Sequence, residues 1–204
     1  MDYALLSSFR VLPVVTADDA DVTVQLARTL RNGGMKAIEI TLRTAAALDA
    51  IRAVKQQVPE IQVAAGTITN PAELAAAVDA GADFFVSPGA TTQLLQAARR
   101  MGVDFVPGVA TASEVMMGLD HDFTVFKLFP ATAAGGIPLL NSLAGPYPNV
   151  RFCPTGGLTP ANFREFLELS NVICCGGSWM VAEGLVRNGN WSEIERLAGE
   201  AMAG

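Results

Sequence analysis

The sequence predicts an α/β fold, a compact (β/α)8 (TIM) barrel with a short N-terminal helix, in a single domain over residues 1–204. Short apolar runs, rich in β-branched and aromatic residues, recur along the chain at intervals of about 20 to 26 residues. Helix-like segments separate these runs, which indicates parallel strands joined by crossover helices. Half of the residues are hydrophobic. That composition suits one packed domain, although the length alone also permits two small ones.

Four β–α units fill the first half of the chain, after an amphipathic helix expected over residues 2–9. Their strands are predicted at residues 10–15, 36–41, 62–67 and 84–88. Capping residues indicate where the intervening helices begin and end. Thr16-Ala17-Asp18-Asp19 precedes the first helix and Asn32-Gly33-Gly34 ends it, Thr44 caps the second, and Asn70 with Pro71 opens the third. A fourth helix is expected over residues 92–100.

The second half of the chain repeats this pattern. Strands are predicted at residues 104–109, 125–130, 150–154 and 171–175, and helices near 138–144, 159–169 and 191–202. Thr111 and Glu114 have the spacing of a capping box, which opens the helix between the first two of these strands. Eight units fit a closed barrel. An open doubly wound sheet is the alternative, but the first strand lacks the glycine-rich dinucleotide loop common in that fold.

The charge and hydropathy patterns narrow the classes of function. The formal net charge is −6 and no basic cluster occurs, which argues against a nucleic-acid partner. No apolar stretch approaches the roughly 20 residues that span a bilayer. Asp2 stands where a secretory signal needs basic residues. We therefore expect a cytoplasmic protein with no membrane partner.

Metal and disulfide chemistry have little support in the sequence. Cys153, Cys174 and Cys175 are too few for a disulfide framework, and we expect them to pack in the core. The last two are neighbours on a predicted strand and point to opposite faces. The single histidine, His121, lies in a polar turn and is expected at the surface. No metal site and no cofactor are predicted.

A lysine lies within one of the apolar strands. Lys127 is the third residue of the run Val125-Phe126-Lys127-Leu128-Phe129-Pro130. Burial disfavours a charged ammonium, and a neutral lysine amine can attack a carbonyl group to form a Schiff base. The alternative is a lysine at the edge of the strand whose ammonium reaches solvent.

Glu39 is the carboxylate that the predicted fold brings to Lys127. In barrels of this kind the reacting groups lie at the carboxyl ends of the strands. Side chains alternate along a strand, so Glu39 and Thr41 share one face while Ile38 and Ile40 face the helices. We expect Glu39 and Lys127 both to point into the barrel mouth. A buried ion pair without chemistry is the alternative.

Two glycine pairs follow the last two predicted strands, as Thr155-Gly156-Gly157 and Gly176-Gly177-Ser178. Glycine lets backbone N–H groups approach an anion, and the start of a helix adds partial positive charge. A phosphate site in this position recurs in (β/α)8 barrels. The pairs therefore predict a phosphate site; two tight turns without a ligand are the alternative. No Gly-x-x-x-x-Gly-Lys-Ser/Thr motif occurs, which argues against a nucleoside triphosphatase.

A phosphorylated carbonyl compound would fit these features together. The glycine turns would hold its phosphate, with the lysine amine near its carbonyl and the carboxylate within reach. Two other classes of function remain open. An isomerase or synthase of the same fold would use the phosphate site without a lysine nucleophile, and a non-catalytic protein would bind the compound without converting it.

Seven segments, in order along nearly the whole chain, carry a family resemblance. They are residues 39–44, 65–67, 87–89, 107–111, 126–131, 151–157 and 176–179. Together they resemble 2-keto-3-deoxy-6-phosphogluconate (KDPG) aldolase, whose family also includes 4-hydroxy-2-oxoglutarate aldolase. The resemblance implies a cofactor-free, homotrimeric class I aldolase of the Entner–Doudoroff pathway, which cleaves KDPG to pyruvate and glyceraldehyde 3-phosphate. The alternative is an aldolase of the same type that prefers 2-keto-3-deoxy-6-phosphogalactonate or 4-hydroxy-2-oxoglutarate.

The resemblance also implies a role for individual residues. Lys127 matches the Schiff-base lysine of the family, and Glu39 matches its general acid/base. The other expected substrate-binding residues are Arg43 and Thr67 near the pyruvate carboxylate, Pro88 and Phe129 as walls of the pyruvyl end, Thr155 at the head of the first glycine turn, and Gly156, Gly157, Gly177 and Ser178 at the phosphate end.

Overall fold

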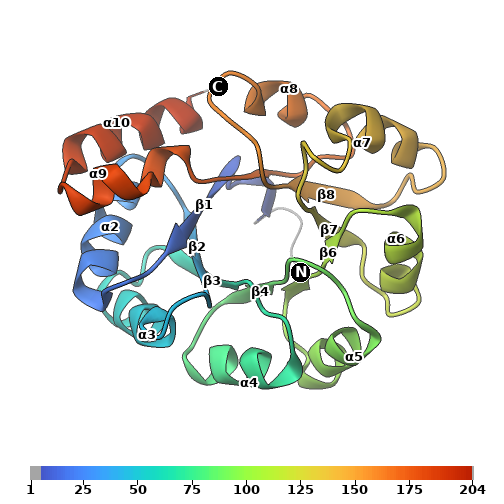
Figure 1. Ribbon diagram of the computed structural model, residues 1–204, viewed down its shortest axis with the longest axis horizontal. Helices are drawn as coiled ribbons and strands as arrows, with labels where there is room; N and C mark the ends of the chain where they lie inside the picture. Colours follow the sequence, from blue (N-terminus) through green and yellow to red (C-terminus); the bar gives the residue numbers. More distant parts are fainter. Residues whose placement is uncertain (1–5, 204) are drawn as a thin grey trace.

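The computed structural model describes residues 6–203, and in it parallel strands curl around a common axis with helices on the outside (Figure 1). The strands over this range are β1 Val11–Thr16, β2 Ala37–Thr41, β3 Gln62–Gly66, β4 Phe84–Val86, β5 Phe105–Val106, β6 Gly108–Val109, β7 Val125–Leu128, β8 Arg151–Pro154 and β9 Cys175–Gly177. The helices are α2 Ala20–Asn32, α3 Ala47–Gln57, α4 Pro71–Asp79, α5 Thr92–Met101, α6 Ala112–Leu119, α7 Gly136–Ala144, α8 Phe163–Leu167, the 3-10 helix η1 Trp179–Val181, α9 Glu183–Arg187 and α10 Trp191–Met202. The predicted α/β class is confirmed.

The strands form two parallel sheets, in the orders β5-β4-β3-β2-β1-β9 and β6-β7-β8. Isolated bridges join Phe152 to Val172 and Thr155 to Gly176, so β8 also lies beside the chain around β9. The single strand predicted over residues 104–109 is divided into β5 and β6 at Pro107. Proline has no N–H for the strand ladder, whereas its carbonyl still accepts the Lys127 N–H at 2.9 Å.

Capping side chains begin two helices where the sequence predicts them. Asp19 Oδ1 accepts the Val22 N–H at 2.9 Å at the start of α2. Thr111 and Glu114 form the predicted capping box of α6, each side chain accepting the other's backbone N–H. These contacts satisfy N–H groups that the first helical turn leaves without a partner.

The prediction that Thr44 caps the second helix is wrong. The Thr44 hydroxyl donates to the Ala17 carbonyl in the loop after β1. Helix α3 begins at Ala47, and its N-cap residue, Ala46, has no side chain that could cap it. Thr44 therefore links two loops at the carboxyl ends of β1 and β2.

The last third of the chain departs most from prediction. The strand expected at residues 171–175 is β9 Cys175–Gly177, because pairing with β1 begins only where Cys175 meets Val11. The helix expected at 159–169 is only α8, since a turn closed by Asn162 Oδ1 and the Thr159 N–H precedes it. The short η1 and α9 were not predicted. Of the helix expected over residues 2–9, residues 6 and 7 are helical and residues 2–5 lie outside the described range.

Buried side chains form separate clusters on the two faces of the curled strands. Ile38, Ile40, Phe126 and Leu128 belong to the outer cluster, between strands and helices, as the alternation predicts. The inner cluster comprises Leu6, Phe9, Leu12, Ala37, Ala64, Phe84, Val86, Val106, Val125, Cys153 and Cys174. It fills the inner space on the side where the strands begin and leaves the carboxyl ends to polar groups.

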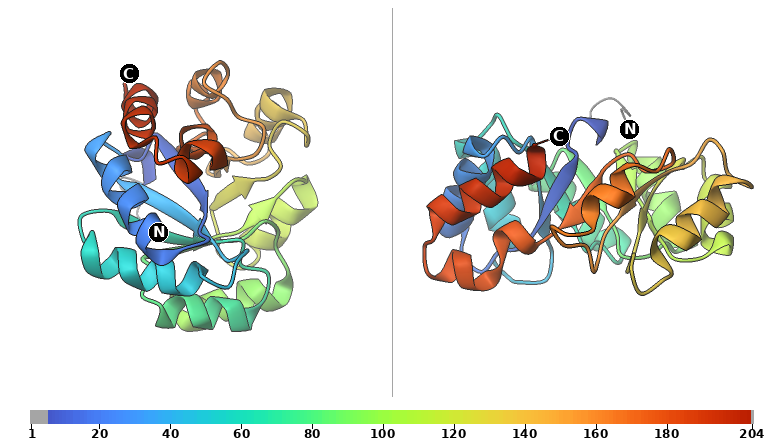
Figure 2. Two further views of the ribbon diagram at one scale, coloured as in Figure 1. Left: turned by 60° about the vertical axis from the view of Figure 1, so that its left-hand side comes forward. Right: turned by 90° about the horizontal axis from the view of Figure 1, so that it is seen from above.

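The C-terminal helix packs along the outside of the strands. Helix α10 contacts α2 and α9, with α9 running beside it (Figure 2). Among the helices of residues 6–203, none is long and apolar enough to cross a membrane.

Candidate active site

Lys127 lies on the inner face of β7. Its register partners are Gly108 on β6 and Cys153 on β8. The residue is 5% exposed. This burial excludes the alternative in which Lys127 lies at the edge of the strand and its ammonium reaches solvent. The side chain instead ends at a carboxylate, with Lys127 Nζ 2.9 Å from Glu39 Oε1.

Glu39 reaches the same point from the opposite side of the inner space. It is the central residue of β2, between Val14 on β1 and Ala64 on β3, and it is 1% exposed. The two side chains therefore form a buried ion pair across the inside of the curled sheet. Two such groups can share a proton, and its transfer to the carboxylate leaves a free amine beside a carboxylic acid.

An aromatic ring covers the amine. Lys127 Nζ lies 5.3 Å from the centroid of the Phe129 ring, a cation–π distance. Pro88 is half-buried on the loop after β4, with its carbonyl packed against Gly108. Ser87, beside it, is fully buried and accepts the Gly108 N–H at 3.1 Å. Pro88 and Ser87 thus contact Gly108, the register partner of Lys127 on β6.

Arg43 lies beyond the carboxyl end of β2 on an exposed loop. It lines a groove of about 850 Å³ that also includes Thr16, Ser178 and Trp179. Within residues 6–203, no hydrogen bond or ion pair engages the Arg43 guanidinium. A guanidinium in this state suits a carboxylate or phosphate, which it can bind with two parallel hydrogen bonds.

Thr67 follows β3 directly and has a left-handed backbone, with φ of 60°. Few residues other than glycine adopt this conformation, and exceptions concentrate at functional sites. The strained position turns the chain at the carboxyl end of β3, beside the strand that carries Glu39.

The first glycine turn follows β8. Thr155 is buried, and Gly156 and Gly157 have φ of 98° and 83°, a range that favours glycine. A Cβ on Gly157 would lie 2.9 Å from the Cβ of Thr132, so this turn also needs glycine for space. The nearest helix, α8, begins only at Phe163. The turn therefore offers backbone N–H groups without the helix N-terminus that the sequence suggested.

The second glycine turn differs from the first. Gly177 is the last residue of β9, where it pairs with Pro13, and a Cβ on it would overlap the Trp179 ring. Ser178 is exposed and starts η1. Thr155 lies beside Gly176, so the two turns, far apart in sequence, adjoin at the carboxyl ends of neighbouring strands.

The cysteines are buried, and all three thiols are free. Cys153 and Cys174 belong to the inner cluster and Cys175 to the outer one, as the prediction of opposite faces requires. A hydrogen bond from Cys174 lowers the pKa of Cys153, and the same contact, with burial, raises the pKa of Cys174 well above its usual value. Burial likewise raises the pKa of Cys175.

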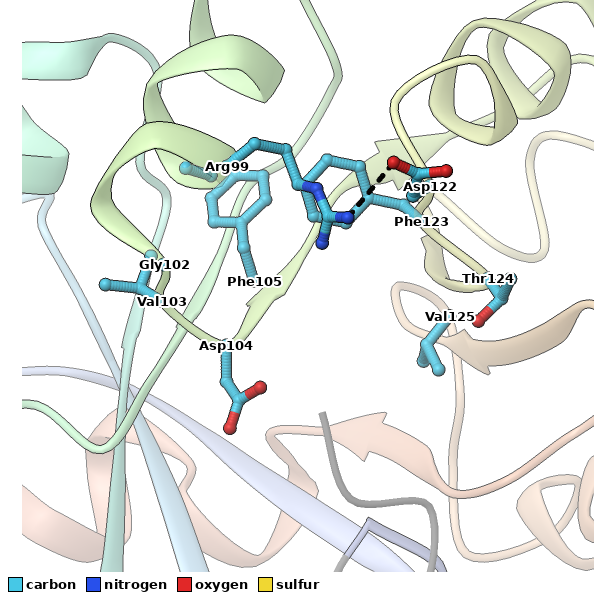
Figure 3. Close-up of a pocket in the computed structure, with 10 residues that line it drawn as sticks. Arg99, Gly102, Val103, Asp104, Phe105, Asp122, Phe123, Thr124 and Val125 are labelled. Carbon is cyan, nitrogen blue, oxygen red and sulfur yellow. Dashed lines mark hydrogen bonds and ion pairs between the residues drawn. The ribbon is translucent and has the colours of Figure 1, made fainter.

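A separate cavity of about 300 Å³ lies at the opposite end of the strands (Figure 3). Phe105 and Val125, at the starts of β5 and β7, line it. The Arg99 side chain crosses it to Asp122 at 3.1 Å and lies over the Phe123 ring. Reacting groups of parallel α/β proteins gather at the carboxyl ends of strands, so this cavity is not part of the candidate site.

Within residues 6–203, no group of three or more His, Cys, Asp or Glu side chains could hold a metal ion. The candidate site comprises the amine–carboxylate pair and the two adjoining glycine turns. The groove that Arg43 lines includes Ser178 of the second turn but neither Lys127 nor Glu39. An amine, a carboxylate and anion-binding turns suit a carbonyl compound that bears anionic groups.

Comparison with known proteins identifies the family. The model of KDPG and KHG aldolase matches residues 3–197. The KHG/KDPG aldolase of Escherichia coli is 45% identical over 201 residues, which are 98% of this chain and 94% of that protein. The chain belongs to the KDPG and KHG aldolase family. It is therefore an aldolase, a carbon–carbon lyase.

Solved aldolase structures share the fold. KDPG aldolase from Legionella pneumophila, captured with pyruvate as a covalent carbinolamine intermediate, has a TM-score of 0.96 and 41% identity, and the match covers 98% of each chain. KDPG aldolase from Zymomonas mobilis with 3-phosphoglycerate has a TM-score of 0.93 and 41% identity, covering 99% of this chain and 95% of that one.

Two close contacts at glycines of this aldolase were not predicted from its sequence. Gly66 lies beside Glu39, and Gly176 beside Thr155, each so close that a Cβ would meet the neighbouring side chain. Small residues on the inner faces of β3 and β9 could have indicated these close contacts. Periodicity alone does not reveal it, because glycine and alanine are common throughout this chain.

Proposed function

We propose that this aldolase cleaves KDPG to pyruvate and glyceraldehyde 3-phosphate through an imine on Lys127, with Glu39 as the general acid/base. The observation that carries the proposal is the 2.9 Å contact between Lys127 Nζ and Glu39 Oε1, buried among the strands. A buried ion pair without chemistry is less favourable, because its desolvation costs about as much as the attraction returns.

Imine formation begins with proton transfer. Lys127 gives a proton to Glu39, and the free amine attacks C2 of the substrate ketone. The resulting carbinolamine loses its hydroxyl as water, with the proton supplied by Glu39, and becomes an iminium. The Phe129 ring, which already lies 5.3 Å from Nζ, stabilises the positive charge on this nitrogen.

Cleavage uses the iminium as an electron sink. The C4 hydroxyl loses its proton to Glu39, directly or through a water. The C3–C4 bond breaks, its electrons move toward the iminium, and glyceraldehyde 3-phosphate leaves. The remaining enamine takes a proton from Glu39 at C3, and hydrolysis of the imine releases pyruvate and restores the Lys127 amine.

The two ends of the substrate have different binding groups. Arg43 binds the carboxylate of the pyruvyl end, near Thr67, while Pro88 and Phe129 keep water from it. Gly156, Gly157, Gly177 and Ser178 bind the phosphate, with Thr155 between this end and the lysine. The adjoining glycine turns support this arrangement, as does the capture of 3-phosphoglycerate by the relative from Zymomonas mobilis.

The finer architecture belongs to the same proposal. The two sheets close into one (β/α)8 barrel in which β5 and β6 count as a single strand across Pro107, and the bridges between β8 and the chain around β9 support this closure. Residues 1–204 form one domain, and three chains assemble as a cytoplasmic homotrimer, as the family resemblance implies. Light scattering coupled to size-exclusion chromatography measures the assembly.

Pyruvate release coupled to lactate dehydrogenase tests the function. KDPG, 2-keto-3-deoxy-6-phosphogalactonate and 4-hydroxy-2-oxoglutarate are compared as substrates. We expect the highest kcat/KM with KDPG and no activity in Lys127→Arg, which keeps the charge and loses the nucleophilic amine. Lys36→Arg, at an exposed lysine, is the matched control and should keep full activity. A higher kcat/KM on either other substrate would contradict the assigned preference, and an active Lys127→Arg would contradict the mechanism.

A further inference from the structure

Gly66 lies against the acid–base carboxylate. It is the last residue of β3, fully enclosed, and pairs with Thr41, two residues after Glu39 on the adjacent strand. Glu39 itself is the register partner of Ala64. The inner face of β3 thus presents two of the smallest side chains where the Glu39 side chain crosses it.

The absence of a side chain at Gly66 makes room for Glu39. A Cβ on Gly66 would lie 2.6 Å from Glu39 Cγ and 2.8 Å from Cδ, and would also meet Oε1. Real Cβ contacts essentially never fall under 3.0 Å. The three nearest atoms to the added Cβ all belong to Glu39, so the glycine leaves space for the Glu39 side chain.

Backbone conformation does not explain the glycine. Gly66 does not have a positive φ, whereas Gly156 and Gly157 of the first glycine turn do. Its strand conformation is open to alanine. Glu39 is 1% exposed and its carboxylate is joined to Lys127, so the side chain can avoid a new methyl group only by moving the carboxylate.

We infer that Gly66 is a positioning residue for catalysis, which holds the Glu39 carboxylate at hydrogen-bond distance from Lys127 by leaving space on β3. The inference rests on the acid–base role proposed for Glu39. A methyl group at this position displaces the carboxylate from the amine, and displacements of about 1 Å can cost about 100-fold in rate. Because the three nearest atoms all belong to Glu39, we expect the loss in kcat and not in substrate affinity.

A double-mutant cycle tests this inference with KDPG as substrate. Gly66→Ala should lower kcat about 100-fold and change KM less than about twofold. Glu39→Ala removes the three atoms that lie nearest to the new methyl group. In that background Gly66→Ala should change kcat less than about twofold. Gly145→Ala, at an exposed glycine of ordinary φ with open space around it, is the control for the substitution itself.

Three results would overturn the positioning role: full activity of Gly66→Ala, an equal loss of kcat in both backgrounds, or a loss expressed mainly in KM. If Gly66→Ala does not fold, the double variant decides the matter by circular dichroism. A folded double variant supports the contact with Glu39, and an unfolded one contradicts it. Failure of the proposed function is distinguishable, since it would show as full activity of Glu39→Ala alone.

Discussion

At the scale of single residues, the arrangement of Lys127 and Glu39 suits the proton transfer proposed for them. Each is buried, they come from opposite sides of the inner space, and the contact between them is 2.9 Å. In the proposed mechanism, the Glu39 carboxylate accepts and returns the protons that imine chemistry moves. Removal of its charge should therefore slow several steps while leaving the nucleophile in place.

Glu39→Gln should lower kcat for KDPG by about 10²- to 10⁴-fold, the range of general acid–base catalysis. The amide keeps the shape of the side chain but cannot take up a proton. Slow trapping of pyruvate on Lys127 by borohydride should persist, because the amine is still present. Steady-state kinetics and intact-protein mass spectrometry measure the two effects. A Glu39→Gln variant with wild-type kcat would exclude Glu39 as the acid–base group.

Arg43→Lys should raise KM for KDPG about tenfold or more with a smaller effect on kcat. Lysine keeps the charge but cannot form the paired hydrogen bonds of a guanidinium to a carboxylate. Arg28→Lys is the matched control, because Arg28 is exposed and bonded to Gln57 outside the groove. If KM is equal in Arg43→Lys and the wild type, Arg43 does not bind the substrate carboxylate.

Cys175 should make the fold sensitive to alkaline pH. Burial raises the pKa of this thiol, so the folded chain keeps its proton above about pH 8.5, where the unfolded chain loses it. The free energy of unfolding then falls as pH rises, by up to about 1.4 kcal/mol per pH unit for one thiol. Urea titrations at pH 8 and pH 10 should show a smaller decline in Cys175→Ala. An unchanged decline would mean that Cys175 does not contribute.

At the scale of secondary-structure elements, capping side chains fix where helices begin and thereby the lengths of the loops that carry the site. Asn70 accepts the N–H groups of Ala72 and Glu73, each at 3.0 Å, and α4 starts at Pro71 as predicted. This cap lies directly after the loop that contains Thr67. The cap is close to Thr67 in sequence, but the Asn70 side chain bonds only to the first turn of α4 and to Thr69 among the described residues.

Asn70→Ala should cost about 1 kcal/mol of stability, because two N–H groups lose their side-chain partner. The expected fall in Tm is about 2–4 °C for a chain of this size. KM for KDPG should not change. Differential scanning calorimetry and kinetics measure both. A variant with unaltered Tm would show that the cap contributes nothing, and a raised KM would connect it to substrate binding.

Sequence patterns predicted elements best where local chemistry decides the structure. Capping boxes and strand alternation located α6 and the inward faces of β2 and β7, because neighbouring residues are sufficient for both. The strand expected at residues 171–175 was misplaced, since its register depends on contact with β1, which is distant in sequence. Thr44 was misassigned for the same reason: its hydroxyl binds a carbonyl from another loop.

In the candidate site, too, features set by neighbouring residues could be predicted and features set by distant contacts could not. Lys127 and Glu39 could be inferred because each interrupts an apolar strand with a charge. Two contacts could not be inferred: the packing of the Pro88 carbonyl against Gly108, and the space that Gly66 leaves for Glu39. Both depend on how closely neighbouring strands approach, which the local sequence pattern does not show.

At the scale of the whole molecule, the inner cluster separates the buried pair of Lys127 and Glu39 from the end where the strands begin. Phe9 is fully buried there, and its ring stacks on Phe84 at 5.8 Å between centroids. Leu6 adjoins a small cavity that reaches Glu39 and Lys127. Leu6 and Phe9 therefore close the inner space at the end where the strands begin.

Phe9→Ala should destabilise the protein by about 3–5 kcal/mol, the cost of truncating a buried aromatic residue. Met116→Ala is the control, because Met116 is 57% exposed and its truncation should stay within about 0.5 kcal/mol. Urea denaturation followed by circular dichroism measures both. Equal stability of the two variants would contradict a closing role for Phe9.

The identity of the nucleophile is the central claim, and borohydride trapping tests it directly. The wild-type protein is incubated with pyruvate, reduced with borohydride, digested and mapped by tandem mass spectrometry. A stable pyruvyl adduct on Lys127 alone, which disappears in Lys127→Arg and persists in Lys36→Arg, is the predicted result. An adduct on another lysine, with Lys127 unmodified, would contradict the account.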